Sequence, residues 1–439
     1  MSDYMFMLES HLSSDQARVV AEVQAAAVQA NMNVFLTGGA LRDMLGGHPI
    51  TEIDFTVEGN AVKLAKTIAD KTGAEILAVD EIRKVTRLLF PGNVPATIGM
   101  ARHEKYPKPG GKPQVQPATI HDDLRGRDFT MNAIALSLSP ASRGLLLDPN
   151  NGVGDLERKE LRTVSNFTLY DDPIRLLRLI RFRVRLGFTI SERTKSQYDN
   201  AREVFMEQKI SPQSLLDELH HLANELNVAD VVQALEAEKL MTLFSPALVG
   251  PKLNLQGLQK LQKVRQLAPV GGGFQFDGFG LFLTVLTEKL TPKERSALVE
   301  ATGMQKADLD EWQKLEARAK KLEKDLKSAK LQKPSHIYHV LAKARGEEML
   351  FLLFKSSERT VQDRIKNYFQ KYLPAAQEIT ERDVIAAGGQ PGTPKFQKLR
   401  EELIATRLDS RPRKPPAPVE GEAGTEVVGP PPVTADVRK

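Results

Sequence analysis

The spacing of hydrophobic residues changes near residue 171. Before that point, several short runs alternate apolar and polar residues, as strands do, and one run places Val19, Val20, Val23 and Ala27 on a single helix face. Beyond it, apolar residues recur mainly at helical spacing. The pattern predicts an α+β fold class in which a mixed sheet is followed by an all-helical region.

The mixed region is predicted to begin after a helix over residues 14–30. Short helices are expected over 41–45 and 61–71, and residues 103–120, rich in Pro, Gly and Lys, are predicted to form a loop. Strands are expected over 33–37, 52–57 and 131–138, with about three more between 74 and 102.

Beyond residue 171 the texture is helical. Residues 271–280, GGGFQFDGFG, predict a flexible break, and residues 411–439 predict disorder because seven of those 29 positions are prolines. Helices are expected over 173–187, 191–207, 212–225, 229–243 and 255–266, with more over about 281–372.

The composition narrows the class of protein. The 439 residues are 41% hydrophobic, which is enough for a sizeable core, and the absence of cysteine excludes disulfides and cysteine-based zinc sites. No apolar run is long enough to span a bilayer, and the N-terminus lacks the pattern of a secretory signal. We therefore expect a cytoplasmic protein without a membrane partner. The net charge of +5 is compatible with nucleic acid and equally with an ordinary soluble surface.

The first candidate for chemistry is the segment from VFLTGGALRD to TEIDFTVEG, residues 34–59. Glu52 and Asp54 lie two residues apart in a predicted strand, so both side chains point to one face. Adjacent carboxylates repel each other and favour a bound cation such as Mg²⁺, which bridges carboxylates to substrate phosphates. Gly38 and Gly39 allow backbone to approach a phosphate, and Arg42 adds a guanidinium suited to phosphate. A plain turn with an Arg42–Asp43 pair is the structural alternative.

A second cluster, DDLRGRDFTMNAIAL, covers residues 122–136. Arginines here would offset charge that develops during phosphoryl transfer, and Asn132 could donate a hydrogen bond to a sugar or phosphate. A loop with surface ion pairs is the alternative. The cluster offers Arg125, Arg127, Asp128 and Asn132.

Two further segments complete the set. Residues 148–164, DPNNGVGDLERKELRTV, begin with strong turn chemistry, for which we favour a structural role. In DDPIRLLRLIRFRVRLGF, residues 171–188, Asp172 is predicted to cap a helix whose first residue is Pro173. Arg175 and Arg178 then belong either to a solvated face or to a nucleotide site, where Asp172 and Arg175, three apart, could read the edge of a base.

Together the four blocks resemble the class II tRNA nucleotidyltransferase and bacterial poly(A) polymerase family. They occur in the family's order over about residues 33–190. The resemblance implies a polymerase-β-like catalytic head followed by helical neck, body and tail regions. We place an N-terminal helix at 1–32, the head at 33–165, the neck at 166–270, the body and tail at 271–410, and a proline-rich tail at 411–439.

The resemblance also implies an activity. The family adds nucleotides to RNA 3′ ends without a nucleic-acid template, using Mg²⁺ and CTP or ATP, so tRNA or another RNA 3′ end is the expected partner; no stable protein partner is evident. Glu52 and Asp54 would bind metal and carry catalysis. The nucleotide would be bound by Gly38, Gly39, Arg42, Arg127, Asp128, Asn132, Asp172, Arg175 and Arg178.

Two positions depart from the family's pattern. Glu52 stands where the family carries its first aspartate, and Thr97 occupies the expected place of a third carboxylate before Ala101-Arg102-His103-Glu104. Glu104 lies seven residues beyond Thr97 and would face the other side of a regular strand. The alternatives are therefore a weakened or inactive RNA- or nucleotide-binding relative, a poly(A) polymerase, or a nucleotidyltransferase acting on small molecules.

Overall fold

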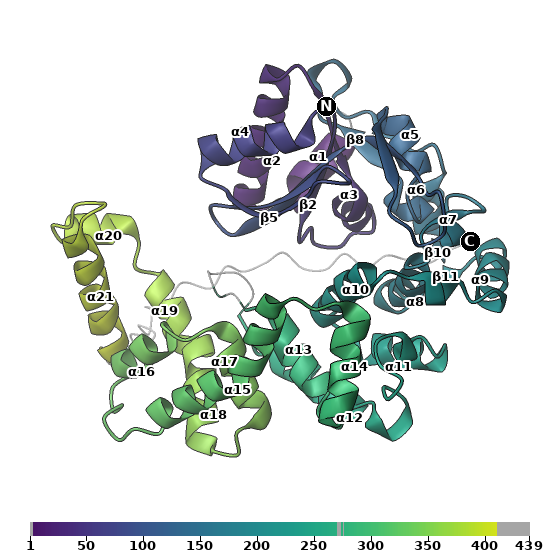
Figure 1. Cartoon of the computed structure of the whole chain (residues 1–439). Helices are drawn as coiled ribbons and strands as arrows, with labels where there is room; N and C mark the ends of the chain where they lie inside the picture. The colour runs from purple at the N-terminus through teal and green to yellow at the C-terminus, as the bar shows by residue number, and fades with distance from the viewer. Residues whose placement is uncertain (1–2, 270–273, 275, 411–439) are drawn as a thin grey trace, which may run out of the picture.

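The computed structural model describes residues 3–269, 274 and 276–410 (Figure 1). The chain forms a mixed head, whose sheet carries helices, and then a long series of helices. This arrangement confirms the predicted α+β fold class with its sheet first and its helices after. Within the described ranges, no helix is both long and apolar enough to cross a bilayer. The predicted flexible break, residues 271–280, lies partly outside the described residues. The predicted disordered tail, residues 411–439, lies wholly outside them.

A seven-stranded sheet, ordered β3-β4-β5-β2-β1-β8-β9, forms the centre of the head. β2 runs parallel to β5, and every other neighbouring pair is antiparallel. Inward residues of β2, such as Phe55 and Val57, are buried. The strands are β1 (Asn33–Thr37), β2 (Ile53–Glu58), β3 (Glu75–Asp80), β4 (Val85–Phe90), β5 (Val94–Met100), β8 (Ala135–Ser137) and β9 (Leu146–Leu147).

Helices cover the head sheet. α2 (Ser14–Gln29) and α4 (Ala61–Thr72) pack against each other and against β5, and α1 (Asp3–His11) packs against α3 (Gly38–Leu45). The N-terminal segment thus holds two helices where the pattern predicted one. The Ser13 side chain accepts a hydrogen bond from the Gln16 amide and caps the start of α2. α3 begins three residues earlier than predicted, directly at the glycine pair.

The predicted loop over 103–120 is wrong. β6 (Arg102–Lys105) pairs antiparallel with β7 (Gln114–Pro117), and only the residues between and after them form the connections. Both strands are four residues long and mostly polar, so they carry no apolar alternation that would reveal them. The strand predicted over 131–138 is also shorter, because Thr130–Asn132 forms a 3₁₀ turn before β8.

Each of the five helices predicted beyond residue 171 is present, although the ends differ. α11 ends at Ala237, and a separate 3₁₀ turn follows over Met241–Leu243. The helices from here on are α8 (Arg175–Leu186), α9 (Glu192–Glu203), α10 (Pro212–Asn224), α11 (Val228–Ala237), α12 (Leu255–Arg265), α13 (Gly278–Leu286), α14 (Pro292–Thr302), α15 (Lys306–Leu326), α16 (Pro334–Leu341), α17 (Gly346–Lys355), α18 (Arg359–Asn367), α19 (Leu373–Gln377), α20 (Glu381–Ala386) and α21 (Pro394–Asp409).

The predicted cap of α8 is wrong. Asp172 follows the short helix α7 (Thr168–Asp171), and α8 begins only at Arg175. Ile174 stands at the cap position with helical dihedrals and no side-chain hydrogen bond. The Asp172 carboxylate faces the Arg175 guanidinium at 3.7 Å instead of the helix amides.

A buried ion cluster joins α8 to α10. Arg181, only 3% exposed, donates Nε to Glu218 Oε1 at 2.6 Å and Nη1 to Glu225 Oε1 at 3.0 Å. Removing one member would leave an uncompensated charge in the interior, at a cost of about 3–5 kcal/mol. α8 and α10 therefore pack as one unit beneath the head (Figure 1).

The turn at residues 148–152 has a structural role, as its chemistry predicts. Asp148 accepts hydrogen bonds from the amides of Gly152 (2.7 Å) and Val153 (2.9 Å), which begin α6 (Gly152–Glu157). Farther along α6, the buried Asp155 accepts from Thr130 Oγ1 at 2.6 Å. This segment therefore supports the residues that lead into β8.

We expect Gly152→Ala to destabilise the head, because a Cβ there would overlap the carbonyl oxygen of Thr130. Overpacking of this kind costs about 1–3 kcal/mol and should lower the thermal unfolding midpoint by several degrees. Gly126→Ala is the matched control, since its Cβ would meet the nearest atom at an ordinary 3.5 Å. Equal midpoints for the two variants would contradict this packing.

Candidate active site

The two carboxylates predicted to lie side by side do converge. Asp54 lies in β2 and Glu52 immediately precedes that strand. The hydroxyl of Thr97 on β5 lies 2.7 Å from Asp54 Oδ1 and 3.1 Å from Glu52 Oε1. A hydroxyl has a single proton, so the two carboxylates share one donor. The structure thus places Glu52, Asp54 and Thr97 in one polar cluster on one face of the sheet.

The charge of this pair suits a cation. Burial, followed by the charge of Asp54, raises the pKa of Glu52, while Arg87 and the Thr97 hydrogen bond oppose the rise. The raised pKa of Glu52 means that too little positive charge lies nearby to stabilise both carboxylates in the ionised form. A divalent ion would supply that charge. In the described part of the chain, no group of three or more His, Cys, Asp or Glu side chains is placed to hold a metal. Glu52 and Asp54 would therefore need substrate and water oxygens to complete an octahedral shell.

The glycine turn lies against the same carboxylates. Gly39 N donates to Asp54 Oδ2 at 3.0 Å, so the N-terminus of α3 points at that charge. Gly38 has a φ of +65°, a conformation that favours glycine. A Cβ on Gly38 would lie 3.1 Å from Asp54 Oδ2 and 3.5 Å from Arg127 Nη1. Glycine therefore lets the turn approach both the carboxylate and the arginine.

A hydrogen-bonded chain connects α3 to the second cluster. Arg42 is 5% exposed; its Nε donates to Asp43 Oδ1 at 2.8 Å and its Nη1 to Asn132 Oδ1 at 2.9 Å. Asn132 in turn donates Nδ2 to Asp128 Oδ1 at 3.0 Å. The Arg42–Asp43 pairing considered as an alternative is therefore present. The guanidinium nevertheless borders the glycine turn, because a Cβ on Gly39 would lie 3.4 Å from Arg42 Nη2.

Arg127 binds this cluster to the sheet. Its Nη2 donates to Thr56 Oγ1 at 3.0 Å and its Nη1 to the carbonyl oxygen of Asn132 at 3.2 Å. Its Nε donates to Asp123 Oδ2 at 2.9 Å. Arg127 is thus held in place beside Gly38 by three separate partners.

The arginines of α8 reach the same cluster. Arg178 Nη2 lies 2.6 Å from Asp128 Oδ2. Burial opposes ionisation of Asp128, but Arg178 and Arg175 outweigh it and hold the pKa of Asp128 below its ordinary value. Arg175 donates Nη2 to the Gly126 carbonyl at 3.3 Å and Nη1 to the Arg127 carbonyl at 3.5 Å. Its side chain is only 11% exposed, so Arg175 does not belong to a solvated face.

Sequence reasoning missed Tyr106, which lies close enough to Asp172 to be affected by its charge. Tyr106 follows β6 and donates to Glu104 Oε2 at 2.6 Å. Burial, then the charges of Asp172 and Glu104, raise the pKa of Tyr106. Glu104 also pairs with Arg102 at 2.6 Å, so it belongs to this neighbouring cluster and does not replace a carboxylate at Thr97. A lone tyrosine in a Pro- and Gly-rich segment gave no signal for this placement.

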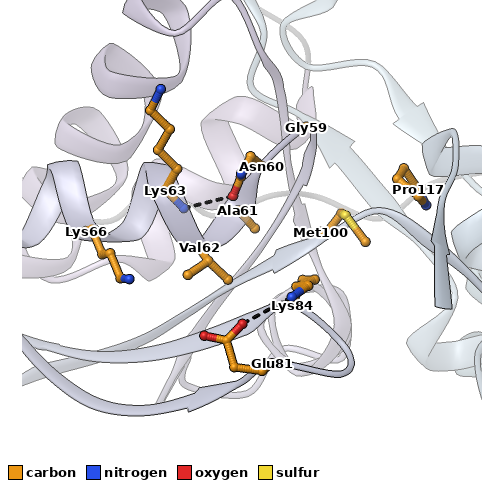
Figure 2. A pocket seen from close by; sticks show the side chains of 10 residues that line it. All are labelled: Gly59, Asn60, Ala61, Val62, Lys63, Lys66, Glu81, Lys84, Met100 and Pro117. Carbon is orange, nitrogen blue, oxygen red and sulfur yellow. Dashed lines mark hydrogen bonds and ion pairs between the residues drawn. The ribbon is translucent and has the colours of Figure 1, made fainter.

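One cavity near the head helices is separate from these residues. Figure 2 shows it beside α4, with a volume of about 670 Å³. Lys63 and Lys66 of α4 and Glu81 and Lys84 near β3 and β4 line it. None of the predicted site residues does so.

Comparison with known proteins agrees with this geometry. Residues 34–162 match the family described as the poly(A) polymerase head domain. The head of this chain belongs to that family. The match spans the glycine turn, the carboxylate pair and the Asp128–Asn132 cluster, and it ends before α8.

Relatives extend the similarity beyond the poly(A) polymerase head. The A-adding tRNA nucleotidyltransferase of Aquifex aeolicus is 28% identical over 85% of this chain and 45% of its own length. The CC-adding tRNA nucleotidyltransferase of Deinococcus radiodurans is 39% identical over 34% of this chain and 40% of its own length. These matches confirm the resemblance drawn from the motifs. The chain spans about half the length of the curated relatives it matches over most of its own length.

A solved structure is similar in fold over nearly the whole chain. The CCA-adding enzyme of Thermotoga maritima, in complex with tRNA, matches with a TM-score of 0.51 and 22% identity. The match covers 93% of this chain and 95% of that one. The poly(A) polymerase head and the helical region thus follow one another as in that enzyme.

We expect Asp128→Asn to destabilise the chain at neutral pH and to have little effect in acid. The folded pKa of Asp128 lies below its ordinary value of 3.8, so its stabilising contribution is present above that value and is lost as the pH falls through the folded pKa. Thermal unfolding midpoints from pH 7 to pH 3 measure the effect. The gap between wild type and variant should narrow as the pH falls below 3.8.

The control for this series is Glu75→Gln, because Glu75 is exposed at the start of β3. It should leave the midpoint unchanged throughout. A gap between wild type and Asp128→Asn that stays constant with pH would contradict the ion pair with Arg178.

Proposed function

We propose that the chain is a template-independent RNA nucleotidyltransferase that adds CMP, AMP or both to tRNA 3′ ends. The observation that carries this proposal is the convergence of Glu52 and Asp54 beside the glycine turn. The names of the A-adding and CC-adding relatives support tRNA as the acceptor. We also propose that the chain acts in the cytoplasm. For the domains, we propose an N-terminal helix at residues 1–32, a catalytic head at 33–165, a neck at 166–270, a body and tail at 271–410, and a separate tail at 411–439.

In the proposed reaction, the terminal ribose hydroxyl of the RNA attacks the α-phosphate of CTP or ATP. The new phosphodiester bond forms as the bond to the β-phosphate breaks, pyrophosphate leaves, and the hydroxyl proton passes to solvent. Glu52 and Asp54 would hold Mg²⁺. When bound, this ion would polarise the phosphate and stabilise charge on the attacking and leaving oxygens.

The remaining predicted residues have roles on the nucleotide side. Gly38 and Gly39 would admit the triphosphate, with Arg42 beside them. Arg127, Asp128 and Asn132 would hold the nucleotide through the hydrogen-bonded chain that already links them. We propose that Asp172 and Arg175 read the base, with Arg178 fixing α8 to Asp128. The head and neck would then select the nucleotide without a template.

The direct test uses tRNA that lacks its 3′ end, with Mg²⁺ and labelled CTP and ATP supplied singly and together. Incorporation of C, of A or of both distinguishes CC-adding, A-adding and CCA-adding activity, and long products from ATP alone indicate poly(A) synthesis. A nucleotidyltransferase of small molecules would label no RNA. Asp54→Ala should abolish incorporation, because half of the carboxylate pair is lost, while the thermal midpoint stays near wild type.

The matched control is Asp70→Ala, because Asp70 is an exposed carboxylate on α4, away from the pair. It should retain full incorporation. Wild-type incorporation by Asp54→Ala would contradict the catalytic assignment of the pair.

A second candidate function is supported by Thr97. This residue places a hydroxyl donor between the two carboxylates, where the resemblance implies a third carboxylate. The chain would then bind tRNA or nucleotide without catalysing addition.

If wild type binds tRNA but incorporates nothing, we expect Glu52→Asp combined with Thr97→Asp to restore incorporation. The double variant supplies a third carboxylate and shortens Glu52 by one methylene, which matters for the strict octahedral geometry of Mg²⁺. Incorporation per minute, measured beside each single variant, is the readout. If the double variant binds tRNA but still incorporates no nucleotide, a purely geometric defect at these two positions would be contradicted.

A further inference from the structure

Strand register places an arginine in line with the carboxylate pair. Thr97 of β5 lies directly opposite Asp54 of β2 on one side and directly opposite Arg87 of β4 on the other. Residues directly opposite each other in neighbouring strands point to the same face of the sheet. Arg87, Thr97 and Asp54 therefore form one row across the face that carries the site.

Arg87 differs from the other arginines near the site, because it is paired with no residue that the structure describes. Its side chain is exposed and, among the described residues, forms neither an ion pair nor a hydrogen bond. The neighbouring Arg42, Arg127 and Arg178 are each held by a carboxylate. At longer range, the charge of Arg87 opposes the burial and the Asp54 charge that raise the pKa of Glu52. Arg87 is thus a cation of the site face that is available to an anion.

The helical region lies near Arg87. Burial lowers the pKa of His221 on α10 well below its ordinary value, and nearby arginines, Arg87 among them, lower it further. The end of β4 and the turn after it also border the helical region, because Leu89 and Asn93 line a cavity of about 720 Å³ together with Met349 of α17. The end of β4 therefore lies on a side of the head that borders the helical region.

The order of the strands separates two sides of the carboxylate pair. The glycine turn follows β1, which neighbours β2 on one side, whereas Arg87 lies on β4, beyond β5 on the other. In phosphoryl transfer the attacking and leaving oxygens stand roughly in line on opposite sides of the phosphorus. If the triphosphate lies on the side of the glycine turn, as proposed above, the attacking strand would approach from the side of β5 and β4.

We propose that Arg87 binds the last phosphodiester of the RNA strand that is being extended. This inference rests on the proposed function and assigns Arg87 to the acceptor strand, not to the nucleotide. A guanidinium pairs with phosphate through two parallel hydrogen bonds, and this contact would hold the terminal ribose next to Asp54 and Glu52. Arg87 is a positioning residue, because it acts on the reacting hydroxyl only through the phosphate beside it.

The test compares Arg87→Ala and Arg87→Lys with Lys66→Ala in the full chain. Lys66 is the matched control because it is also exposed and cationic but lies on α4, beside the separate cavity (Figure 2). The probe is tRNA that lacks its 3′-terminal nucleotides, with binding measured over a series of salt concentrations. A second probe carries a neutral methylphosphonate in place of the last phosphodiester.

We expect Arg87→Ala to weaken tRNA binding about tenfold and to reduce the slope of log Kd against log salt by about one, the signature of one lost phosphate contact. Arg87→Lys should recover most of the slope because it keeps the charge. The methylphosphonate should weaken binding to wild type but not to Arg87→Ala. Affinity for ATP and CTP alone, and the thermal midpoint, should stay unchanged.

Three results would overturn the inference. Arg87→Ala could behave as Lys66→Ala, the methylphosphonate could weaken binding equally with and without Arg87, or nucleotide affinity could fall in place of RNA affinity. If wild type incorporates nucleotides while one of these results holds, the proposed function stands and only the role of Arg87 fails. Absence of both RNA binding and incorporation in wild type would contradict both.

Discussion

The contact between Asp128 of the head and Arg178 of α8 holds the candidate site together. Its two charged atoms lie 2.6 Å apart, and a chain of hydrogen bonds runs from Asp128 through Asn132 to Arg42 beside the glycine turn. A shift of α8 would therefore reach the turn through three side chains. Asp128 and Arg42 are both buried, so each of these charges needs its partner to stay in the interior. The candidate site is therefore built from residues of both the head sheet and α8.

Thr97 and Arg87 both modify the surroundings of the carboxylate pair. Thr97 supplies the carboxylate pair with a proton donor, and Arg87 supplies the same sheet face with a fixed positive charge. Both sit on the two strands that lie beyond β2, away from the glycine turn. The departure from the family's pattern at Thr97 thus lies on the side of the pair from which we propose that the acceptor strand approaches.

Much of this could be predicted from the sequence where the chemistry is local. The bounds of β1 follow from a short apolar run, Val34 to Leu36, and Glu52 and Asp54 converge because a spacing of two in extended backbone fixes their common face. The glycine turn follows from its two adjacent glycines, whereas its approach to Asp54 depends on the pairing of β1 with β2.

What could not be predicted depends on pairing between distant segments. β6 and β7 are polar and short, so their pairing and the position of Tyr106 follow from tertiary contacts. Asp172 looks like a helix cap in sequence, yet the nearby Arg175 takes its carboxylate. Arg87 shows no signal in its own segment, because its relation to Asp54 exists only through the register of three strands.

The ion cluster of Arg181 limits where this chain could be joined to a relative in a chimaeric protein. Glu218 and Glu225, the two partners of Arg181, lie on and just after α10, more than thirty residues beyond it in sequence. A hybrid joined at Gly187, the natural-looking break after α8, would separate the arginine from both acids and combine it with another protein's helix. Recombination that respects these charges must cross over after Glu225, so α8 and α10 would be inherited as a single block together with the head.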